Sequence, residues 1–464
     1  MNTPNTLCYR SPHAMQQPAA ESSSYSCFAE LTNNYNVSIS TPSCIPSDDE
    51  TNNYLKEKLR ELENVMLGPE EDPDPDPEID PPETVSWTQM MEAITGGDIK
   101  QVLIACAKAV SVNDWSTAGC LMGELRKMVS VTGDSIQRVG AYMLEGLVAR
   151  LAASGSSIYT AMRFRDPGFF DTVMFNHILF EVCPYFKFGH MSANGSIADA
   201  MKGEAQVHII DFQIGQGNQW VSLIQAFARR PGGPPHIRMT GIDGISSSAD
   251  DGVGVKLSHL AASCKVPFDF HHAYMYENEV HLENLRIHPG EALAVNFGFI
   301  LHRVPDESVS TQNHRDRLLR QVRSLNPKVV TLVEQESNTN TAPFLPRFLE
   351  TLDYYTAVFE SIDAVLQRDH KNRILVEQHC LAKGVVNVVS CEGTDRVERH
   401  EVMGKWKSRF LMAGFQPYPL NPQVNRTIKE LLGNYSNQYR LEVRNDTLYL
   451  GWKDRDLVAS CAWK

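Results

Sequence analysis

Apolar residues along the chain recur with two different periods, and the change falls near residue 205. From Trp87 to about Lys202 they recur every three to four residues, the spacing of amphipathic helices. Two helical faces are clear: Ile99, Val102, Leu103, Cys106 and Val110, then Leu121, Leu125 and Met128. Asp134 is placed to cap a third helix that runs to Ala153. The pattern therefore predicts an almost wholly helical region before residue 205.

Beyond residue 205 short apolar runs alternate with helical segments, as in a right-handed, mostly parallel sheet. The predicted strands are Val207 to Asp211, Ile237 to Ile242, Phe268 to Ala273, Ala292 to Gly298, Val329 to Gln335 and Thr356 to Ile362. A hairpin is predicted from Arg440 to Val443 and Thr447 to Trp452, turning at Asn445 and Asp446, with Leu457 to Trp463 as a further strand. The predicted fold is α/β: a Rossmann-like, methyltransferase-like, mostly parallel sheet with a helical cap.

The first 83 residues show neither period and are predicted to form a disordered regulatory tail. Residues 1–50 are rich in Ser, Asn, Thr and Pro, so they cannot bury enough apolar surface to offset chain entropy. Four apolar residues from Leu55 to Met66 recur at helical spacing and predict a short amphipathic helix over 54–66, suited to binding a partner. Proline alternates with acidic residues over 69–83, which predicts a stiff acidic linker.

A glycine-containing turn directly follows the first predicted strand, as in nucleotide-binding crossovers. Asp211 stands at the carboxyl end of that strand, and Gly215 and Gly217 follow it. In S-adenosylmethionine-dependent methyltransferases, glycines usually stand two, four and six residues after the strand-end acid. Here the first of the three is Gln213, whose side chain would crowd the approach that glycine leaves open.

Two interpretations of this turn remain. Asp243 ends the next strand, where an acid can meet ribose hydroxyls, so Asp211, Gly215, Gly217 and Asp243 are candidate ligand-binding residues. In the structural interpretation, which we favour, Asp211 caps the turn and the glycines allow close packing of strand and helix. The spacing predicts no confident cofactor site.

No other constellation of residues predicts chemistry. The run Gly244 to Ser248 lacks the second glycine of a nucleophile elbow. The histidines at 271, 272 and 302 have no partners at metal-binding spacing, so we expect ordinary structural histidines and no metal site. Asp306 is predicted to cap a helix that begins after the loop Val304 to Ser308. We expect no catalytic residues and no enzyme.

The formal net charge of −13 argues against a protein that holds DNA mainly by its own electrostatics. Basic residues do gather on two predicted helices: Arg315, Arg317, Arg320 and Arg323, then Arg396, Arg399, Lys405, Lys407 and Arg409. Acids such as Asp316, Glu398 and Glu401 lie between them, so we expect solvated helix faces.

The ten cysteines and the apolar runs indicate a soluble intracellular protein. The cysteines show no pairing pattern typical of a zinc site or a disulfide framework, so we expect reduced thiols. The most apolar run, Ala292 to Leu301, is about half the length that a membrane helix requires. We expect no membrane partner.

Several blocks of the sequence, in order, resemble the plant GRAS family. The run Val207, His208, Ile209, Ile210 and Asp211 matches the motif after which the family's central block is named. Further matching blocks are Ile237 to Asp243, Leu301 to Ser308, Asn326 to Glu336, Cys391 to Glu401, and an ending with Trp452 and Trp463. The resemblance implies one GRAS domain over 84–464, covering a leucine-rich region (about 97–160), the VHIID block (about 176–245), a second leucine-rich region (about 257–289), the PFYRE block (about 298–392) and the SAW block (about 395–464).

The chain departs from the family pattern at two places. Lys383 and Gly384 stand where many members have an Arg-Glu pair, and Ser460 to Trp463 is a variant of Ser-Ala-Trp. That ending, together with the helix predicted from Tyr54, is most similar to the branch of phytochrome A signal transduction and chitin-inducible gibberellin-responsive proteins.

The resemblance implies a transcriptional regulator or co-regulator that bridges protein partners in light, hormone or stress signalling. The implied partners are DNA-bound transcription factors and other GRAS proteins, in homodimers or heterodimers, with DNA contacted mainly indirectly. The implied location is the nucleus, with the cytoplasm left open, and no cofactor is implied. Two alternatives remain: a small-molecule-binding or S-adenosylmethionine-dependent methyltransferase-like protein, and a direct sequence-specific DNA-binding factor.

Overall fold

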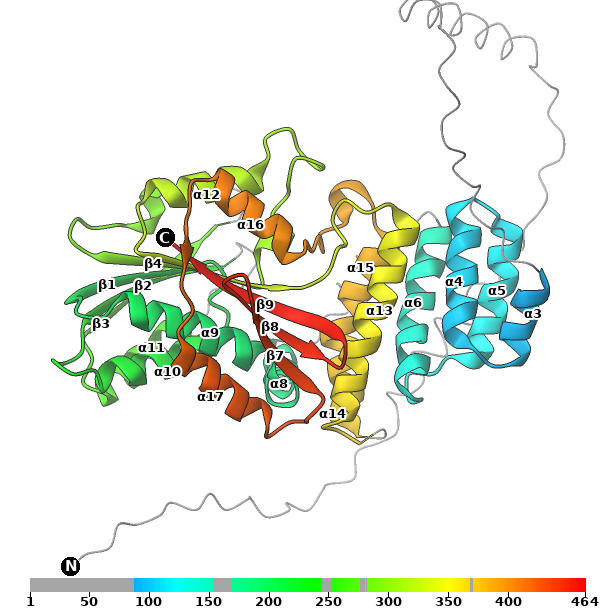
Figure 1. The fold of residues 1–464 in the computed structure, drawn as a ribbon, viewed down its shortest axis with the longest axis horizontal. Coiled ribbons are helices and arrows are strands. Elements are labelled where there is room, and N and C mark those ends of the chain that lie inside the picture. The colour runs from blue at the N-terminus through cyan, green and yellow to red at the C-terminus, as the bar shows by residue number, and fades with distance from the viewer. Residues whose placement is uncertain (1–86, 153–168, 244–251, 276–279, 281, 368–369) are drawn as a thin grey trace, which may run out of the picture. The chain divides into compact units, whose positions relative to one another are not determined.

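The computed structural model describes residues 87–152, 169–243, 252–275, 280, 282–367 and 370–464 (Figure 1). All of them belong to one compact unit, Thr84–Lys464. The tail helix predicted over 54–66 and the linker predicted over 69–83 lie outside the described residues.

A nine-stranded mixed sheet forms the centre of this unit. Its order is β3-β2-β1-β4-β5-β9-β8-β7, and β6 pairs with β9. The strands are β1 Gln206–Asp211, β2 His236–Asp243, β3 Phe268–Tyr274, β4 Ala292–Gly298, β5 Val329–Gln335, β6 Pro417–Tyr418, β7 Tyr439–Arg444, β8 Thr447–Trp452 and β9 Arg455–Trp463. Strands β1 to β5 pair in parallel, whereas β9, β8 and β7 add antiparallel. The predicted α/β fold with a mostly parallel sheet is confirmed.

One predicted strand is wrong: Thr356 to Ile362 is helical. It belongs to α13 Phe344–Asp363, a helix of 20 residues. The buried residues of α13 include Phe348, Leu352, Tyr355, Phe359 and Ile362, which recur at intervals of three or four. The β-branched and aromatic residues that suggested a strand thus pack at helical spacing, and tertiary packing overrides their local preference.

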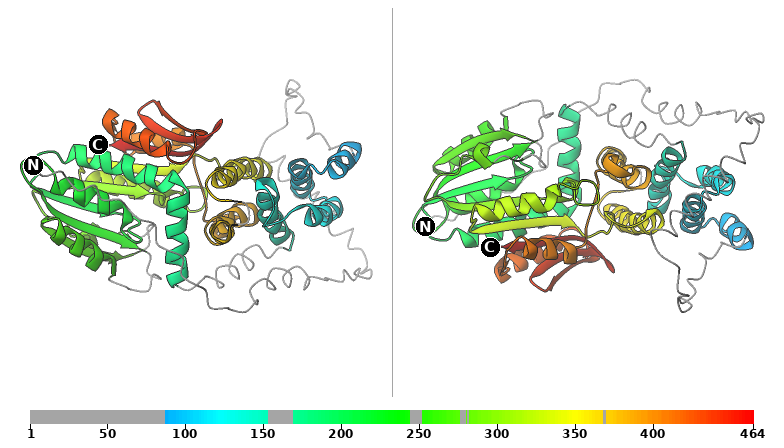
Figure 2. Two further views of the ribbon diagram at one scale, coloured as in Figure 1. Left: turned by 90° about the horizontal axis from the view of Figure 1, so that it is seen from below. Right: turned by 90° about the horizontal axis from the view of Figure 1, so that it is seen from above.

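Strand β1 lies between β2 and β4 and is covered on both faces, which explains its apolar sequence. Val207 and Ile209 pack with α9 Pro184–Ala200 and α10 Asn218–Ala228 on one face. Ile210, on the other face, belongs to a core cluster with residues of α12 His314–Ser324 and α16 Met403–Met412. Figure 2 shows helices on both faces of the sheet.

The predicted helical region before residue 205 is confirmed where it is described. It contains α3 Trp87–Thr95, α4 Ile99–Ser111, α5 Trp115–Met128, α6 Ser135–Leu151, α8 Phe169–Val182 and α9. Asp134 caps α6 through a capping box with Gln137, and the described helix ends at Leu151. All five predicted core residues of α4 are buried. Helix α6 packs against α13 and α15 Ala382–Ser390, and α3 to α5 extend from its other side (Figure 1).

The remaining elements are helices and short helical turns between the strands and helices already named. They are α11 Gly252–Ser263, α14 Lys371–Val376, a π-helical turn Glu377–Leu381, α17 Pro422–Leu432, and 3₁₀ turns at Leu282–Leu285, Leu301–Arg303 and Gly393–Asp395. The predicted hairpin is confirmed as β7 and β8. Asn445 and Asp446 both have positive φ, as a tight two-residue hairpin turn requires.

No helix in the described part of the chain is long and apolar enough to cross a membrane. The cysteines that the structure describes are all free thiols.

Candidate functional site

The turn after β1 lies at the carboxyl edge of the parallel sheet, where α/β proteins bind ligands. Asp211 is only 2% exposed there. Trp220 Nε1 donates to Asp211 Oδ2 at 2.8 Å, and Asn296 Nδ2 donates to Asp211 Oδ1 at 2.9 Å. We call Asp211, Trp220 and Asn296 the strand-end cluster. Both oxygens of the carboxylate are occupied by groups of the chain itself.

Burial and the strand-end cluster act on Asp211 in opposite directions. Burial raises the pKa of Asp211 to about 6, although the hydrogen bonds from Asn296 and Trp220 act in the opposite direction. Asp211 serves as an acceptor for two buried donors. It holds α10 and β4 against β1.

Gln213 lies in the turn after β1 and bonds to the end of β4. With its amide oriented to satisfy both groups, the side-chain nitrogen donates to the carbonyl of Phe299 at 3.0 Å and to that of Gly298 at 3.2 Å. Ile214 packs directly over Gly241, where an added Cβ would lie 2.8 Å from Ile214 Cβ. The side chains of residues 213 and 214 thus occupy space that a glycine would leave to a ligand.

The two glycines of the turn serve the backbone. Gly215 and Gly217 have φ of 49° and 66°, the left-handed region that favours glycine. Gly217 is also the N-cap of α10, and a Cβ there would lie 3.1 Å from Leu257 and Val253. Close packing therefore accounts for Gly217, whereas at Gly215 an added Cβ would meet nothing within 4 Å and only the positive φ favours glycine.

Asp243, the second candidate acid, is less enclosed. Its Oδ2 lies 3.1 Å from His272 Nε2, and its Oδ1 accepts from the backbone N–H of Gly215 at 3.4 Å. The His272 ring stacks on Tyr274 at 4.1 Å between centroids. The structure therefore joins Asp243 to the turn but not to the carboxylate of Asp211, which faces the interior.

Analysis of the sequence missed a buried polar cluster, which gathers arginines and carboxylates around α12 and α16. We call Asp306, Arg315, Asn340, Glu401 and Arg409 the arginine–carboxylate network. Each of the five is buried. Arg409 donates to Glu401 at 2.7 and 2.9 Å and to Asp306 at 3.4 Å, and Arg315 lies 3.2 Å from Glu401. Asn340 donates to Asp306 and Glu401.

The network corrects the prediction of solvated basic helix faces. Arg315, Arg396, Arg399 and Arg409 are buried, and Arg396 and Arg399 precede α16 instead of lying on it. Arg320 is exposed, as expected. Buried guanidinium groups require carboxylate or carbonyl acceptors. Most of the acceptors here come from segments distant in sequence. These arginines are unable to reach a phosphate backbone.

Asp306 also differs from its predicted role. Asn313, and not Asp306, caps α12. Asp306 Oδ1 instead accepts from the backbone N–H of Ser308 at 3.1 Å, while Oδ2 belongs to the network. Burial raises the pKa of Asp306, but the hydrogen bonds from Ser308 and Asn340 and the charge of Arg315 outweigh it and hold that pKa below its usual value.

His302 has partners that its sequence neighbours do not reveal. Its Nδ1 lies 2.8 Å from Glu334, and its Nε2 lies 3.1 Å from Glu398. The ring of His400 stacks on it at 4.2 Å. The sequence predicted an ordinary structural histidine without partners at metal-binding spacing; its partners come from β5 and from the segment before α16, which no local spacing brings together.

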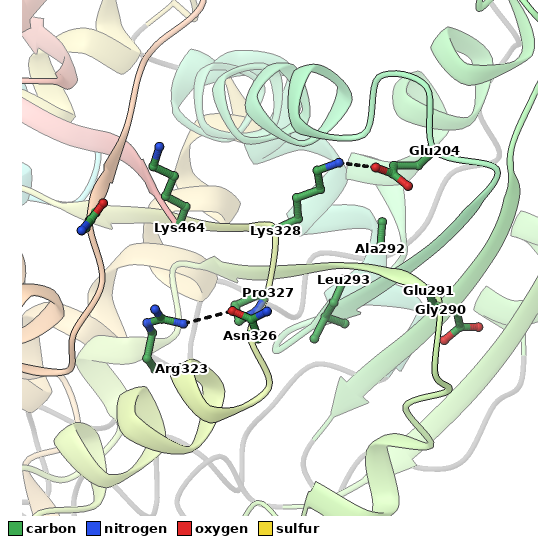
Figure 3. Close-up of a pocket in the computed structure, with 11 residues that line it drawn as sticks. Glu204, Gly290, Glu291, Ala292, Leu293, Arg323, Asn326, Pro327, Lys328 and Lys464 are labelled. Atoms are coloured by element: carbon green, nitrogen blue, oxygen red, sulfur yellow. Dashed lines mark hydrogen bonds and ion pairs between the residues drawn. The ribbon is translucent and has the colours of Figure 1, made fainter.

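A pocket of about 580 Å³ opens at the amino edge of the sheet, opposite the strand-end cluster (Figure 3). It is lined by Glu204, Gly290, Glu291, Ala292, Leu293, Arg323, Asn326, Pro327, Lys328, Gln416 and Lys464. Lys328 pairs with Glu204 across it, and Arg323 donates to Asn326 (Figure 3). None of the predicted site residues lines this pocket.

The aromatic residues of the last block pack in the core. Trp463 is buried and stacks on Phe410 at 4.9 Å between centroids. Trp452 is also buried and donates to Glu360 at 3.3 Å. Both tryptophans therefore fix strands β8 and β9 to the helices beside them.

Comparison with known proteins gives consistent matches across this unit. The family model described as the GRAS domain family matches residues 99–464. Scarecrow-like transcription factor PAT1 of Arabidopsis thaliana is 61% identical over 91% of this chain and 88% of that protein. Chitin-inducible gibberellin-responsive protein 2 of Oryza sativa subsp. japonica is 56% identical over 91% of this chain and 78% of that protein.

A solved structure agrees with the sequence matches. The crystal structure of SCL7 from Oryza sativa superposes with a TM-score of 0.70 at 32% identity, covering 79% of this chain and 99% of that chain. The family match spans most of the chain, and the blocks that resemble the family coincide with the strand-end cluster, the network and the last strands. The chain belongs to the GRAS family.

Proposed function

We propose that this protein is a nuclear transcriptional co-regulator that bridges protein partners, with no enzymatic activity of its own. Its relatives carry names such as transcription factor and gibberellin-responsive protein, which supports a regulatory role in plant signalling. The observation that carries the proposal is the enclosure of Asp211: the acid that a methyltransferase presents to its cofactor is bonded here to Trp220 and Asn296.

The distribution of charge supports indirect contact with DNA. The net charge is −13, and four of the arginines that might have formed a basic face are buried. A protein with a net negative charge gains little from counterion release. We therefore propose that DNA-bound transcription factors bring the protein to its target genes.

Two kinds of crosslinking distinguish bridging from direct binding. Ultraviolet light joins a protein only to DNA that it touches, whereas a protein–protein crosslinker followed by formaldehyde also recovers DNA held through a partner. Bridging predicts strong recovery of target DNA with the second treatment and background recovery with the first. Equal recovery would establish direct binding instead.

Calorimetry tests the methyltransferase alternative. S-adenosylmethionine and its demethylated product are titrated separately into the full chain. We expect no binding heat from either. Micromolar binding that disappears in Asp243→Ala would reopen an enzymatic or ligand-sensing role.

We further propose that α4 and α5 contribute to a surface for other GRAS proteins. Val112 and Trp115 are 59% and 50% exposed and lie three residues apart in sequence, at the turn between these helices. Large exposed apolar residues that lie together mark interaction surfaces more often than isolated ones do.

The double change Val112→Ser with Trp115→Ser should weaken self-association at least about tenfold, as truncation of an interfacial tryptophan typically does. The unfolding midpoint should hardly change. Sedimentation velocity measures the association. Val255→Ser, at a similarly exposed valine on α11, is the matched control; equal weakening by both variants would remove the proposal.

A further inference from the structure

Two histidines and two glutamates from three separate segments converge beside the carboxyl end of β5. His302 lies on the 3₁₀ turn after β4, Glu334 lies on β5, and Glu398 and His400 precede α16. His302, Glu334 and His400 are buried and offer ligand atoms that lie within 4.8 Å of one another. Imidazole and carboxylate together are a donor set that zinc and similar divalent ions take in proteins.

The distances at Glu398 match the spacing of ligands around one ion. Glu398 Oε2 lies 3.1 Å from His302 Nε2 and 3.5 Å from His400 Nε2. Ligand atoms at the usual zinc distances in a tetrahedron lie about 3.3 Å apart. The two rings stack at 4.2 Å with 25° between their planes, so both Nε2 atoms approach the same carboxylate oxygen.

Glu334 orients His302 in the way that metal sites require. Its Oε2 lies 2.8 Å from His302 Nδ1, so a proton on Nδ1 leaves the lone pair on Nε2 for an ion. A histidine that binds metal commonly donates its other ring nitrogen to a carboxylate in this way. His400 Nδ1 is buried and has no hydrogen-bond partner among the described residues.

We propose that His302, Glu398 and His400 bind a structural divalent metal ion of the zinc type, with Glu334 holding His302 in the ligating tautomer and a water as the fourth donor. The ion would join the turn after β4 to the segment before α16, and β5 would hold the turn in place. This site is independent of the proposed regulatory function.

The test uses the full chain, stripped with a chelator and then titrated with Zn²⁺ in competition with a chromophoric chelator. We expect one tightly bound ion per chain and a higher unfolding midpoint with zinc. Glu398→Gln and His400→Gln should abolish this stoichiometric binding. Glu334→Gln should weaken it about 10- to 100-fold, as loss of an orienting partner does at metal sites.

His272→Gln is the matched control, because His272 also pairs with a partly buried carboxylate, that of Asp243. It should bind zinc like the unaltered protein. Stoichiometric binding that survives in folded Glu398→Gln and His400→Gln, or no tight binding by the unaltered chain, would overturn the site.

Cobalt replacement keeps the test decisive if those variants do not fold. Co²⁺ in the proposed site should give visible absorption typical of nitrogen and oxygen ligands. A near-ultraviolet thiolate charge-transfer band would place the ion on the free cysteines and overturn the proposal.

Discussion

The strand-end cluster and the arginine–carboxylate network are both buried and polar, yet they are built in opposite ways. Both join segments that are distant in sequence: Asp211 accepts from Asn296, 85 residues away, and Asp306 accepts from Arg409, 103 residues away. The first is a single charge held by neutral donors, and the second is a set of opposite charges. Neutral donors thus fix one carboxylate at a turn, while paired charges fix two helices and the loops beside them against each other.

Breaking the network should have the largest effect. Arg409→Ala would remove the guanidinium closest to the buried Glu401 and a second contact of the buried Asp306, and we expect a loss of about 3–5 kcal/mol in the free energy of unfolding. Chemical denaturation followed by tryptophan fluorescence measures it. Arg320→Ala, at an exposed arginine on α12, should change stability by less than about 0.5 kcal/mol. Similar losses in both would show that the network contributes little.

Breaking the strand-end cluster should cost less, because its partners are neutral. Asp211→Ala would leave the indole N–H of Trp220 without an acceptor, and the amide of Asn296 would keep only its hydrogen bond to Gln219, at a cost of about 1–3 kcal/mol. The same denaturation experiment measures the loss. Asp243→Ala removes a less buried carboxylate and should cost less. The reverse order would mean that the outer acid is the structural one.

Replacing Gln213 by glycine should have the smallest effect on stability. Gln213→Gly supplies the glycine that methyltransferases usually have, but Asp211 stays enclosed and Ile214 still fills the space above Gly241. We expect no S-adenosylmethionine binding in a calorimeter and a stability change below about 1 kcal/mol. Binding gained by this single change would identify Gln213 as the sole barrier and Asp211 as a latent ligand residue.

Strands with short, β-branched apolar runs were predictable because their period differs from that of helices. The five parallel strands fall within one residue of their predicted bounds at each end. The segment Thr356 to Ile362 misled because its residue types suit strands while its spacing suits the helix in which it lies. The residue types of this segment favour a strand and their spacing favours a helix, and the packing of the folded protein selects the helix.

The polar sites also differ in how far they could be predicted from the sequence. Asp211, Gly215 and Gly217 stand within seven residues of each other, so their shared turn was visible in the sequence. His302 meets Glu334 and Glu398 only after the sheet has formed, and no spacing rule joins residues so far apart. The burial of the arginines was likewise not predictable from their spacing, because their carboxylate partners lie on other segments of the chain.

The position of β9 has a consequence for how the chain is made. Strand β9 pairs with β5 on one side and β8 on the other, although some 120 residues of sequence separate it from β5. During synthesis the edge of β5 emerges from the ribosome long before its partner does. Until residues 455–463 arrive, the nascent chain carries an open, apolar strand edge of the kind that chaperones shield from aggregation.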